Sequence, residues 1–592
     1  MSAPTQDLDA IAIGQRIIDC CLREDIRGLL SQGQVHSLPA DWVVPADLAD
    51  IRHWLFISHL GDEEWVLPVH RASPLQAWSM LGDRWLCHRS GGIHLEQGYG
   101  RWLERLGQGL DDETRQLFAA YQREADCAVQ QRRLCAEAYG VHIARLDRVL
   151  DAPRWDRRLL GIDQLASYLD HPFYPTARAK SGFDTAALRQ YAPEFAPSFT
   201  LRWLAVPTGQ LNLTCPVPPF WPDFTEVGLP AELAASHGLL PVHPLTWTEL
   251  AQQGLPDNSV RAPRAFLEVE PTLSLRTVVC QAHPHWHLKL PLLVCTLGAR
   301  NLRLIKPSTL YDGHWFQRTL LALARRDAAL GERYLHVDEQ HGGHAAEQRH
   351  LAYIARRYPD ELASTTLVPV AALASPLSDG RLLLEALAER FHDGDLGAWL
   401  EHYLGLLLQV HLRLWLRYGI ALEANQQNAV LIFESGRPLR LLMKDNDAAR
   451  LWPQRFVQAC PDLAGQVHGL RDERIRVDSS QPLGEMFCTI TLQLNIVAVL
   501  EAMAVRRLAP RASLYKQLRR CLAQTLEQLE REGIDTRDAR SALLDSPHLP
   551  VKYLLSAGSL FSKAHSGAQD INKFYGYSAR NFLLEDLPCN GD

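Results

Sequence analysis

The sequence predicts an α+β protein, because helical periodicity dominates both ends of the chain and strand-like alternation gathers in the middle. Near the N-terminus, apolar residues recur at three- and four-residue spacing over residues 11–30, 98–106 and 111–139. Alternation of apolar and polar residues, which indicates strands, covers residues 272–279 and 283–296. Amphipathic helical patterns return after the middle third, over residues 483–508 and 512–533.

The composition is that of an ordinary globular protein. Of the 592 residues, 47% are hydrophobic and 22% are charged, which is enough apolar material for a sizeable core. A net charge of −7 excludes the strong basic field expected of a protein that binds nucleic acid or an anionic membrane. Any anion site must therefore be a local cluster of arginine and lysine.

Targeting and cysteine patterns indicate a cytoplasmic protein. The first residues lack a basic, apolar secretion signal, and no stretch reaches the roughly 18 uninterrupted apolar residues of a membrane span. The 12 cysteines form no CxxC pair, which favours a reducing compartment over a disulfide framework or a zinc ribbon. We expect small-molecule substrates, with no nucleic-acid or membrane partner.

Residues 1–150 are expected to form a mostly helical domain that serves as a scaffold or lid. A short β-like patch interrupts the helices, with apolar runs at 54–57 and 65–69 joined by a polar Gly-Asp turn. No site chemistry stands out in this part of the sequence.

Residues 170–183, reading DHPFYPTARAKSGF, predict an extended basic loop. Prolines three positions apart hold the backbone extended. Arg178 and Lys180 are two positions apart and therefore project to the same side of an extended chain. Such a loop can line an anion site, and it can equally be a solvated surface turn.

A second basic cluster follows in the strand-like segment 272–279. Alternation there would put Thr272, Ser274 and Arg276 on one face and Thr277 on the other. Lys289 lies in the next strand pattern, and Arg300, Arg303 and Lys306 come after it. Hydroxyl groups and cations on neighbouring strands would make a cradle for a polyanion. The alternative is a sheet with one solvated, charged face.

Histidines at positions 283, 285 and 287 would share one strand face and suggest a metal site. No acidic or cysteine partner accompanies them, so we favour a polar strand face. From about residue 312 to 390 the pattern predicts helices, with a loop near Gly342 and Gly343.

The segment 409–450 predicts a helix, a polar loop, a β-hairpin and an acidic loop in that order. Gly419 can end the helix in a left-handed conformation. The hairpin should bring Asn428 close to Asp445, because residues that flank a tight turn pair across it. A carboxamide and a carboxylate are hard-oxygen ligands that suit Mg²⁺ with bound phosphates. A polar hairpin end facing water is the alternative.

The order of these motifs resembles that of the IucA/IucC family, the NRPS-independent siderophore synthetases. His-Pro-x-x-Pro, Pro-Val-His-Pro, Ser-x-Arg-Thr, Lys, Arg, Glu-Ala-x-x-Gln-Asn and Lys-Asp follow one another over residues 165–450. The resemblance implies that ATP adenylates a carboxylate, typically of citrate, and that an amine or alcohol then displaces AMP. It also implies a homodimer and a fold likened to a cupped hand. A thumb-like domain (1–150), fingers with an antiparallel sheet (151–385) and a largely helical palm (386–592) would form that hand.

The resemblance also implies roles for particular residues. The triphosphate loop would contain Ser274, Arg276 and Thr277, and Lys289 would contact phosphate. Arg300 would hold a carboxylate of the acid substrate, with Asn425 beside it. The nucleotide and its Mg²⁺ would meet Glu423, Gln427, Asn428 and Asp445. The loop over the nucleotide would contribute His171, Arg178 and Lys180.

Fixed cations are what such chemistry requires. A carboxylate that attacks the α-phosphate approaches an ATP with about four negative charges, so metal and protein cations must offset the repulsion. Arg276, Lys289 and Arg300 would supply three positive charges and are the predicted catalytic residues.

The sequence departs from the family pattern at three places. Asn425 and Tyr174 each stand where relatives carry histidine. Leu245-Thr246 replaces an aromatic-Gln pair after Pro-Val-His-Pro. These departures are compatible with nucleotide binding and leave open the acid substrate and any histidine base.

Two other functions fit parts of the pattern. A kinase-like phosphotransferase also places metal ligands on a helix, loop and hairpin, but no HxD precedes Asn428 and no early Gly-rich loop occurs. A non-catalytic, degenerate homologue would explain the replaced histidines. Formation of AMP and pyrophosphate, rather than ADP, separates the ligase from the kinase.

Overall fold

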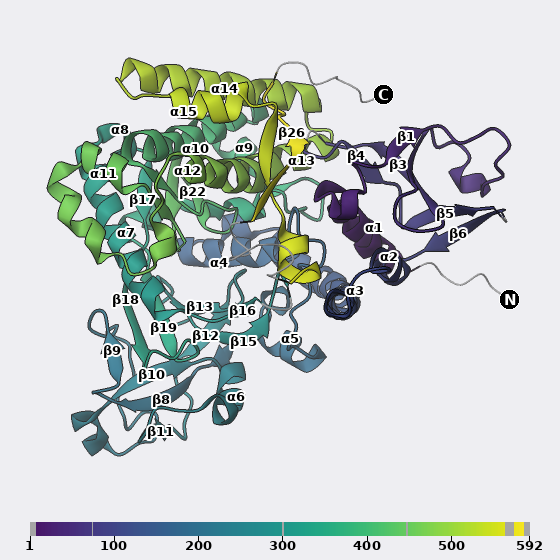
Figure 1. Cartoon of the computed structure of the whole chain (residues 1–592). Helices are drawn as coiled ribbons and strands as arrows, with labels where there is room; N and C mark the ends of the chain where they lie inside the picture. Colours follow the sequence, from purple (N-terminus) through teal and green to yellow (C-terminus); the bar gives the residue numbers. More distant parts are fainter. Residues whose placement is uncertain are drawn as a thin grey trace.

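The N-terminal part of the computed structural model is built on an antiparallel sheet backed by helices (Figure 1). Strand order is β1-β2-β3-β5-β6, with β4 paired to β3. The strands are β1 (Gln34–His36), β2 (His53–Ile57), β3 (Glu64–Arg71), β4 (Trp78–Met80), β5 (Arg84–Arg89) and β6 (Gly92–Gln97). The helices are α1 (Leu8–Arg23), α2 (Tyr99–Leu106) and α3 (Asp112–Leu146). The expected β-like patch is present as β2 and β3, and it belongs to a larger sheet, because residues between α1 and α2 form six strands.

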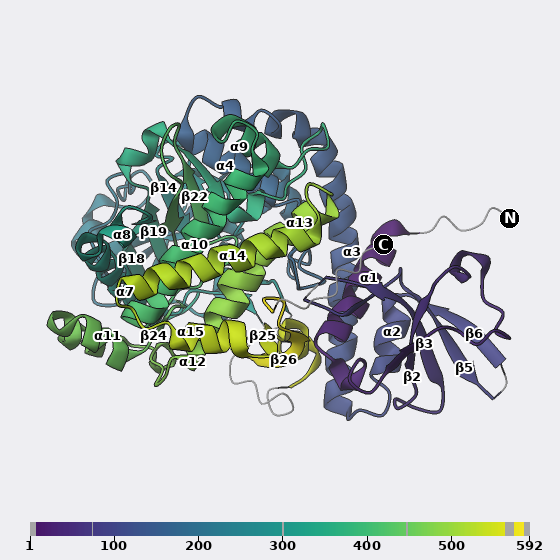
Figure 2. The same cartoon turned by 90° about the horizontal axis from the view of Figure 1, so that it is seen from above.

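The structure describes residues 7–584, apart from 74, 91, 299–300, 446–447 and 563–573. Within that range α3 runs from the N-terminal sheet to the body of the molecule (Figure 2). Its first turn is capped by Asp111, whose side chain accepts a hydrogen bond from the backbone N–H of Thr114 at 2.9 Å.

The middle of the chain forms a seven-stranded sheet with the order β7-β12-β13-β14-β19-β18-β9, beside a smaller sheet β10-β8-β11. The large sheet contains β7 (Phe199–Thr200), β9 (Leu211–Leu213), β12 (Glu268–Pro271), β13 (Thr277–Cys280), β14 (Trp286–Lys289), β18 (Asp338–Ala345) and β19 (Ala352–Arg357). The small sheet contains β8 (Arg202–Pro207), β10 (His237–Val242) and β11 (Val260–Arg261), and β15 (Leu292–Cys295) pairs with β16 (Leu302–Arg303) nearby. Helices of this part are α4 (Trp155–Ala166), α5 (Thr185–Tyr191), α6 (Pro244–Gln253), α7 (Pro307–Arg326) and α8 (Ala328–Gly331).

Three sequence-based expectations are corrected here. Residues 272–276 form a turn between β12 and β13 rather than a strand, and Leu275 adopts a left-handed φ of 64° at its centre. His283 and His285 precede β14, so the three alternating histidines do not share a strand face. The stretch expected to be helical up to residue 390 contains strands β17–β20, because the buried apolar runs there are too short to tell strand from helix.

The C-terminal part packs helices around a four-stranded sheet of order β17-β23-β22-β20. The strands are β17 (Tyr334–His336), β20 (Thr366–Pro369), β22 (Ala429–Phe433) and β23 (Arg440–Met443). The main helices are α9 (Leu383–Phe391), α10 (Leu396–Tyr418), α11 (Pro453–Ala459), α12 (Gln481–Met486), α13 (Ala498–Val505), α14 (Arg511–Arg531) and α15 (Arg537–Arg540). A short pair, β21 (Ile420–Ala421) and β24 (Arg450–Leu451), closes the end of α10.

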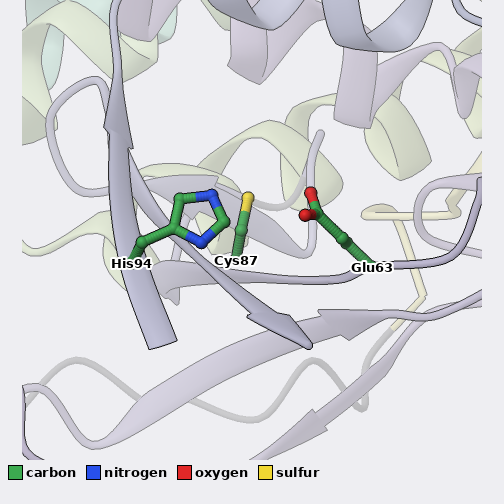
Figure 3. Close-up of side chains that lie close together, drawn as sticks. All are labelled: Glu63, Cys87 and His94. Atoms are coloured by element: carbon green, nitrogen blue, oxygen red, sulfur yellow. The ribbon is translucent and has the colours of Figure 1, made fainter. Parts of the chain in front are cut away.

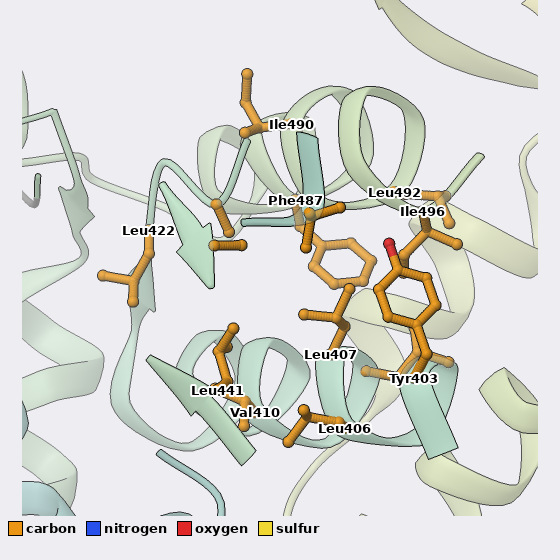
Figure 4. Close-up of a cluster of buried hydrophobic side chains, with 14 of the residues drawn as sticks. Tyr403, Leu406, Leu407, Val410, Leu422, Leu441, Phe487, Ile490, Leu492 and Ile496 are labelled. Atoms are coloured by element: carbon orange, nitrogen blue, oxygen red, sulfur yellow. The ribbon is translucent and has the colours of Figure 1, made fainter. Parts of the chain in front are cut away.

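The core of this part lies between α10 and the helical run 481–505, where leucine, isoleucine and aromatic side chains interdigitate (Figure 4). That run is long and apolar enough to span a membrane, but 72% of its most apolar window is buried inside the protein, so it is a core helix. Tyr403 Oη donates to Asn495 Oδ1 at 2.6 Å, and Asn495 Nδ2 donates to the carbonyl of Ala424 at 2.9 Å. The core thereby fixes the polar loop that follows α10.

The C-terminal segment returns to the first helix. After β25 (His548–Lys552), which pairs with β26 (Tyr575–Arg580), a helical turn at 556–560 packs against the N-terminal lobe. The buried Glu24 carboxylate, at the end of α1, accepts backbone N–H groups of Leu555 at 2.9 Å and Ser556 at 2.8 Å. Leu555 and Phe561 complete the core formed by α1 and the N-terminal sheet.

Candidate functional site

The hairpin of β22 and β23 positions the predicted metal-side residues. Ala429 pairs with Met443, and the N–H of Lys444 donates to the carbonyl of Asn428 at 3.2 Å. Asp445 follows directly, so the carboxylate and the carboxamide lie at the same end of the hairpin, as the sequence predicted.

The polar loop before β22 is shaped by its own side chains. Asn425 Oδ1 accepts the backbone N–H groups of Gln427 and Asn428, both at 3.0 Å. Asn428 Nδ2 donates to the carbonyl of Glu423 at 3.0 Å. Asn425, expected beside the acid substrate, therefore uses its carbonyl oxygen to form the loop. Gln427 is half-buried next to it.

Asp445 meets cations carried by the large sheet. Its Oδ1 forms an ion pair with Nζ of Lys289, a residue at the end of β14 that is 2% exposed. Arg356 Nη2, from β19, lies 3.8 Å from the same oxygen. Burial alone would raise the pKa of the Asp445 carboxyl, but Lys289 and Arg356 hold that pKa well below its usual range. The positive charge of Arg276 acts in the same direction, so cations from two strands and one turn of the large sheet meet the end of the hairpin.

A buried carboxylate that sequence reasoning missed holds Asp445 in place. Both oxygens of Glu339 accept the backbone N–H of Asp445, at 3.1 and 3.0 Å, where the chain has a left-handed φ of 67°. Arg356 Nε donates to Glu339 Oε1 at 2.5 Å. Burial would raise the pKa of Glu339, but the Arg356 guanidinium overrides it and the pKa falls to about 2. No local motif marks this pair, because Glu339 and Arg356 lie about a hundred residues before Asp445 in the sequence.

The turn 272–276 is tied to the same cluster. Ser274 Oγ accepts the N–H of Thr277 at 3.1 Å, and Thr277 pairs with Lys289 across β13 and β14. Asp163, from α4, accepts the N–H of Leu273 at 2.9 Å. Arg276 is half-buried and donates from Nη1 to the carbonyl of Leu304 at 2.6 Å. The turn therefore presents a hydroxyl and a guanidinium next to the buried Lys289.

A second buried lysine, Lys444, directly precedes Asp445 at the end of the hairpin. Lys444 is 7% exposed, and burial lowers its pKa. The negative charge of Asp163 opposes that shift, as do those of Asp445 and Glu339. The cluster thus places four cations, Lys289, Arg276, Arg356 and Lys444, around three carboxylates, Asp445, Glu339 and Asp163.

The loop 171–182 is braced by protein contacts. His171 Nδ1 accepts the N–H groups of Phe173 at 3.1 Å and Tyr174 at 2.9 Å. Arg16, from α1, donates to the carbonyls of His171 at 2.6 Å and Tyr174 at 3.1 Å. Burial lowers the pKa of His171 to about 3, so its imidazole is neutral at physiological pH.

Both predicted cations of this loop have carboxylate partners. Arg178 donates to Asp170 Oδ1 at 2.8 Å and to the carbonyl of Ser167 at 2.7 Å. Lys180 Nζ contacts Glu194 Oε1 at 2.5 Å. Their partners differ from those of the Asp445 cluster, so the structure does not bring these two cations together with Lys289.

Tyr174 and Arg300 complete the set of predicted positions. Tyr174 Oη donates to Glu124 on α3 and lies near Ser559 Oγ, both at 2.8 Å. It thus links the loop to the C-terminal segment. Arg300 lies outside the described residues.

Comparison with known proteins matches a segment of the chain to a family. The IucA/IucC family model matches residues 159–375, and a model described as ferric iron reductase FhuF-like transporter matches residues 397–565. Residues 159–375 thus carry the IucA/IucC segment of the siderophore synthetase ligases, the family that the motif order indicated.

Individual relatives are distant. Staphyloferrin B synthase of Staphylococcus aureus is 24% identical over 66% of this chain and 71% of its own length. Aerobactin synthase of Escherichia coli is 24% identical over 54% of this chain and 60% of its own length. Among solved structures, petrobactin biosynthesis protein AsbB of Bacillus anthracis has a TM-score of 0.72 at 15% identity, covering 97% of this chain and 96% of its own. ATP-bound aerobactin synthetase IucA of Klebsiella pneumoniae has a TM-score of 0.68 at 17% identity, covering 97% and 100%. These similarities confirm the α+β fold.

Proposed function

We propose that the chain is an ATP- and Mg²⁺-dependent, AMP-forming ligase that joins a polycarboxylic acid of the citrate class to an amine or alcohol. The observation that carries the proposal is the convergence of Lys289 and Arg276 on Asp445 at the end of the hairpin. An excess of buried cations is what a triphosphate requires, and an ionised carboxylate beside them is what its metal requires.

The proposed metal side consists of hard oxygens that fit Mg²⁺. Asp445 is ionised, and Asn428 has its Nδ2 engaged with the Glu423 carbonyl, which leaves its Oδ1 as the ligand atom. The Glu423 carboxylate completes the set. Bound there, Mg²⁺ would offset part of the ATP charge and align the phosphates.

In the proposed first step, a carboxylate oxygen of the acid attacks the α-phosphorus, a P–O bond to pyrophosphate breaks, and an acyl-adenylate forms. Charge that develops on the phosphoryl oxygens would be stabilised by Lys289 and Arg276, with the Ser274 turn beside them. In the second step the amine or alcohol attacks the acyl carbon and AMP leaves with the shared oxygen. We assign Arg300 to a carboxylate of the acid and Gln427 to the nucleotide.

The His171 to Gly182 loop is proposed to cover the nucleotide, with Arg178 and Lys180 acting through the loop's shape. A cytoplasmic homodimer with thumb (1–150), fingers (151–385) and palm (386–592) is proposed on the same family resemblance. The match to the IucA/IucC family favours this ligase over a kinase-like phosphotransferase.

The test is a pyrophosphate-release and hydroxamate assay with citrate, 2-oxoglutarate and a citryl monoamide as acids. We expect pyrophosphate and AMP with one of these acids. Formation of ADP would favour the kinase. Absence of Mg²⁺-ATP binding by calorimetry would leave a non-catalytic homologue.

A further inference from the structure

Three metal-ligating side chains converge on the N-terminal sheet, within a lobe that the proposed ligase chemistry does not use (Figure 3). They are Glu63, Cys87 and His94, and their ligand atoms all lie within 4.8 Å of one another. We propose that this cluster is a Zn²⁺ site that ties three strands of the lobe together.

The sheet register places the three ligands. Cys87 on β5 pairs directly with His94 on β6, and directly opposed residues of antiparallel strands project to the same face. Cys87 also pairs with Trp65 on β3. Glu63 lies directly before β3, two positions before Trp65, and its carboxylate reaches the same side of the sheet as Cys87 and His94. The backbone therefore brings the ligands together before any metal binds.

The chemistry of the set matches zinc. Thiolate, imidazole and carboxylate are its preferred ligands, with bonds of about 2.0–2.3 Å that a modest closing of this cluster would provide. The Cys87 side chain is fully buried, whereas the His94 side chain is 48% exposed. The metal would therefore enter from the His94 side and reach sulfur at the bottom of the site.

The net charge around the cluster is negative and favours a divalent cation. Arg105 Nη1 lies 2.8 Å from Glu63 Oε2, yet that buried oxygen accepts no aligned hydrogen bond from a described residue. The charged neighbours are three carboxylates, Glu63, Glu96 and Glu104, and two guanidinium groups, Arg101 and Arg105. Their sum is −1, and a Zn²⁺ with one thiolate adds +1. Metal binding would neutralise the cluster and compete with Arg105 for Glu63.

The test is titration of the chelator-treated full-length protein with Co²⁺, a coloured substitute for Zn²⁺. We expect a thiolate-to-cobalt charge-transfer band that saturates at one equivalent and is bleached by Zn²⁺. Cys87→Ser should abolish the band. His94→Ala, at a half-exposed position that folding tolerates, should weaken Co²⁺ binding at least tenfold.

Cys215→Ser, which removes a thiol outside the cluster, is the matched control and should leave the band unchanged. The proposal is overturned if the wild-type protein shows no saturable band, or if the band survives in the Cys87→Ser protein. Unaltered Co²⁺ affinity in His94→Ala would equally overturn it.

Discussion

Two buried arginines differ in how many of their hydrogen-bond donors have partners within the protein. Arg178, in the loop 171–182, donates from Nε, Nη1 and Nη2 to Asp170 and to the carbonyls of Ser167 and Tyr168. Arg356, in the Asp445 cluster, donates from Nε to Glu339, but its buried Nη2 has no hydrogen-bond partner among the described residues. Every nitrogen of the Arg178 guanidinium donates a hydrogen bond within the protein, so this side chain stabilises the loop. The unpartnered Nη2 of Arg356 lies beside an ionised carboxylate and can donate to a ligand.

Replacement of Lys289, which lies beside Arg356 in the Asp445 cluster, should give the largest loss of activity. Lys289→Ala removes a preplaced cation from the proposed phosphate site, and loss of one such group costs about 3–4 kcal/mol, or 10²–10³ in kcat. Pyrophosphate release measures it. Lys516→Ala, which removes an exposed lysine of α14, is the control and should retain activity. Near-normal turnover of Lys289→Ala would remove this residue from the catalytic set.

Arg178 should affect stability rather than chemistry. Arg178→Ala leaves Asp170 and two carbonyls short of donors in a buried site, so the free energy of unfolding should fall by about 3 kcal/mol. Thermal denaturation measures the loss, and Arg189→Ala, at an exposed ion pair, should change it little. If Arg178→Ala instead kept its Tm and lost affinity for ATP, the distinction between the two arginines would fail.

Glu339 should affect binding of Mg²⁺-ATP indirectly, by holding Asp445 in position. Glu339→Gln removes the negative charge that contacts Arg356 and replaces one of the two oxygens that accept the Asp445 N–H. Affinity for Mg²⁺-ATP should therefore fall about 10- to 100-fold, as it does when residues that orient metal ligands are replaced. Isothermal titration calorimetry with Mg²⁺-ATP measures this affinity in the absence of the acid substrate, so that no turnover occurs. Glu339→Asp, which retains the charge, should recover part of the affinity. Equal losses in both variants would indicate a general packing defect.

The effect that is smallest at neutral pH concerns His171. Burial lowers the pKa of its imidazole from the ordinary 6.5 to about 3 in the folded protein, so below pH 6.5 the unfolded chain binds the extra proton. Its contribution to stability is therefore complete above pH 6.5 and is lost as pH falls towards 3, by about 1.4 kcal/mol for each pH unit. His171→Asn keeps an acceptor for the loop N–H groups and should flatten the acid limb of a stability profile. If the free energy of unfolding of His171→Asn fell with pH as steeply as that of the wild-type protein, groups other than His171 would be responsible for the loss.

The sequence predicted what local pattern controls. Apolar runs flanking a turn defined the hairpin before Asp445, and the spacing of Arg276, Lys289 and Asn428 matched a known motif order. It could not predict Glu339, whose role depends on a residue that only tertiary structure brings near. The left-handed turn at Leu275 carries no glycine, so alternation there suggested a strand. Of the N-terminal strands, β2 and β3 were predicted from their apolar runs, whereas β1, β4, β5 and β6 were missed because they are short and lie among polar turns.

The contact between Glu24 and the backbone at residues 555–556 bears on when the N-terminal lobe can finish folding during synthesis. The lobe that leaves the ribosome first lacks Leu555 and Phe561 of its core until nearly the whole chain has been synthesised. During translation this lobe exposes an unfilled apolar surface that only the last part of the nascent chain can cover.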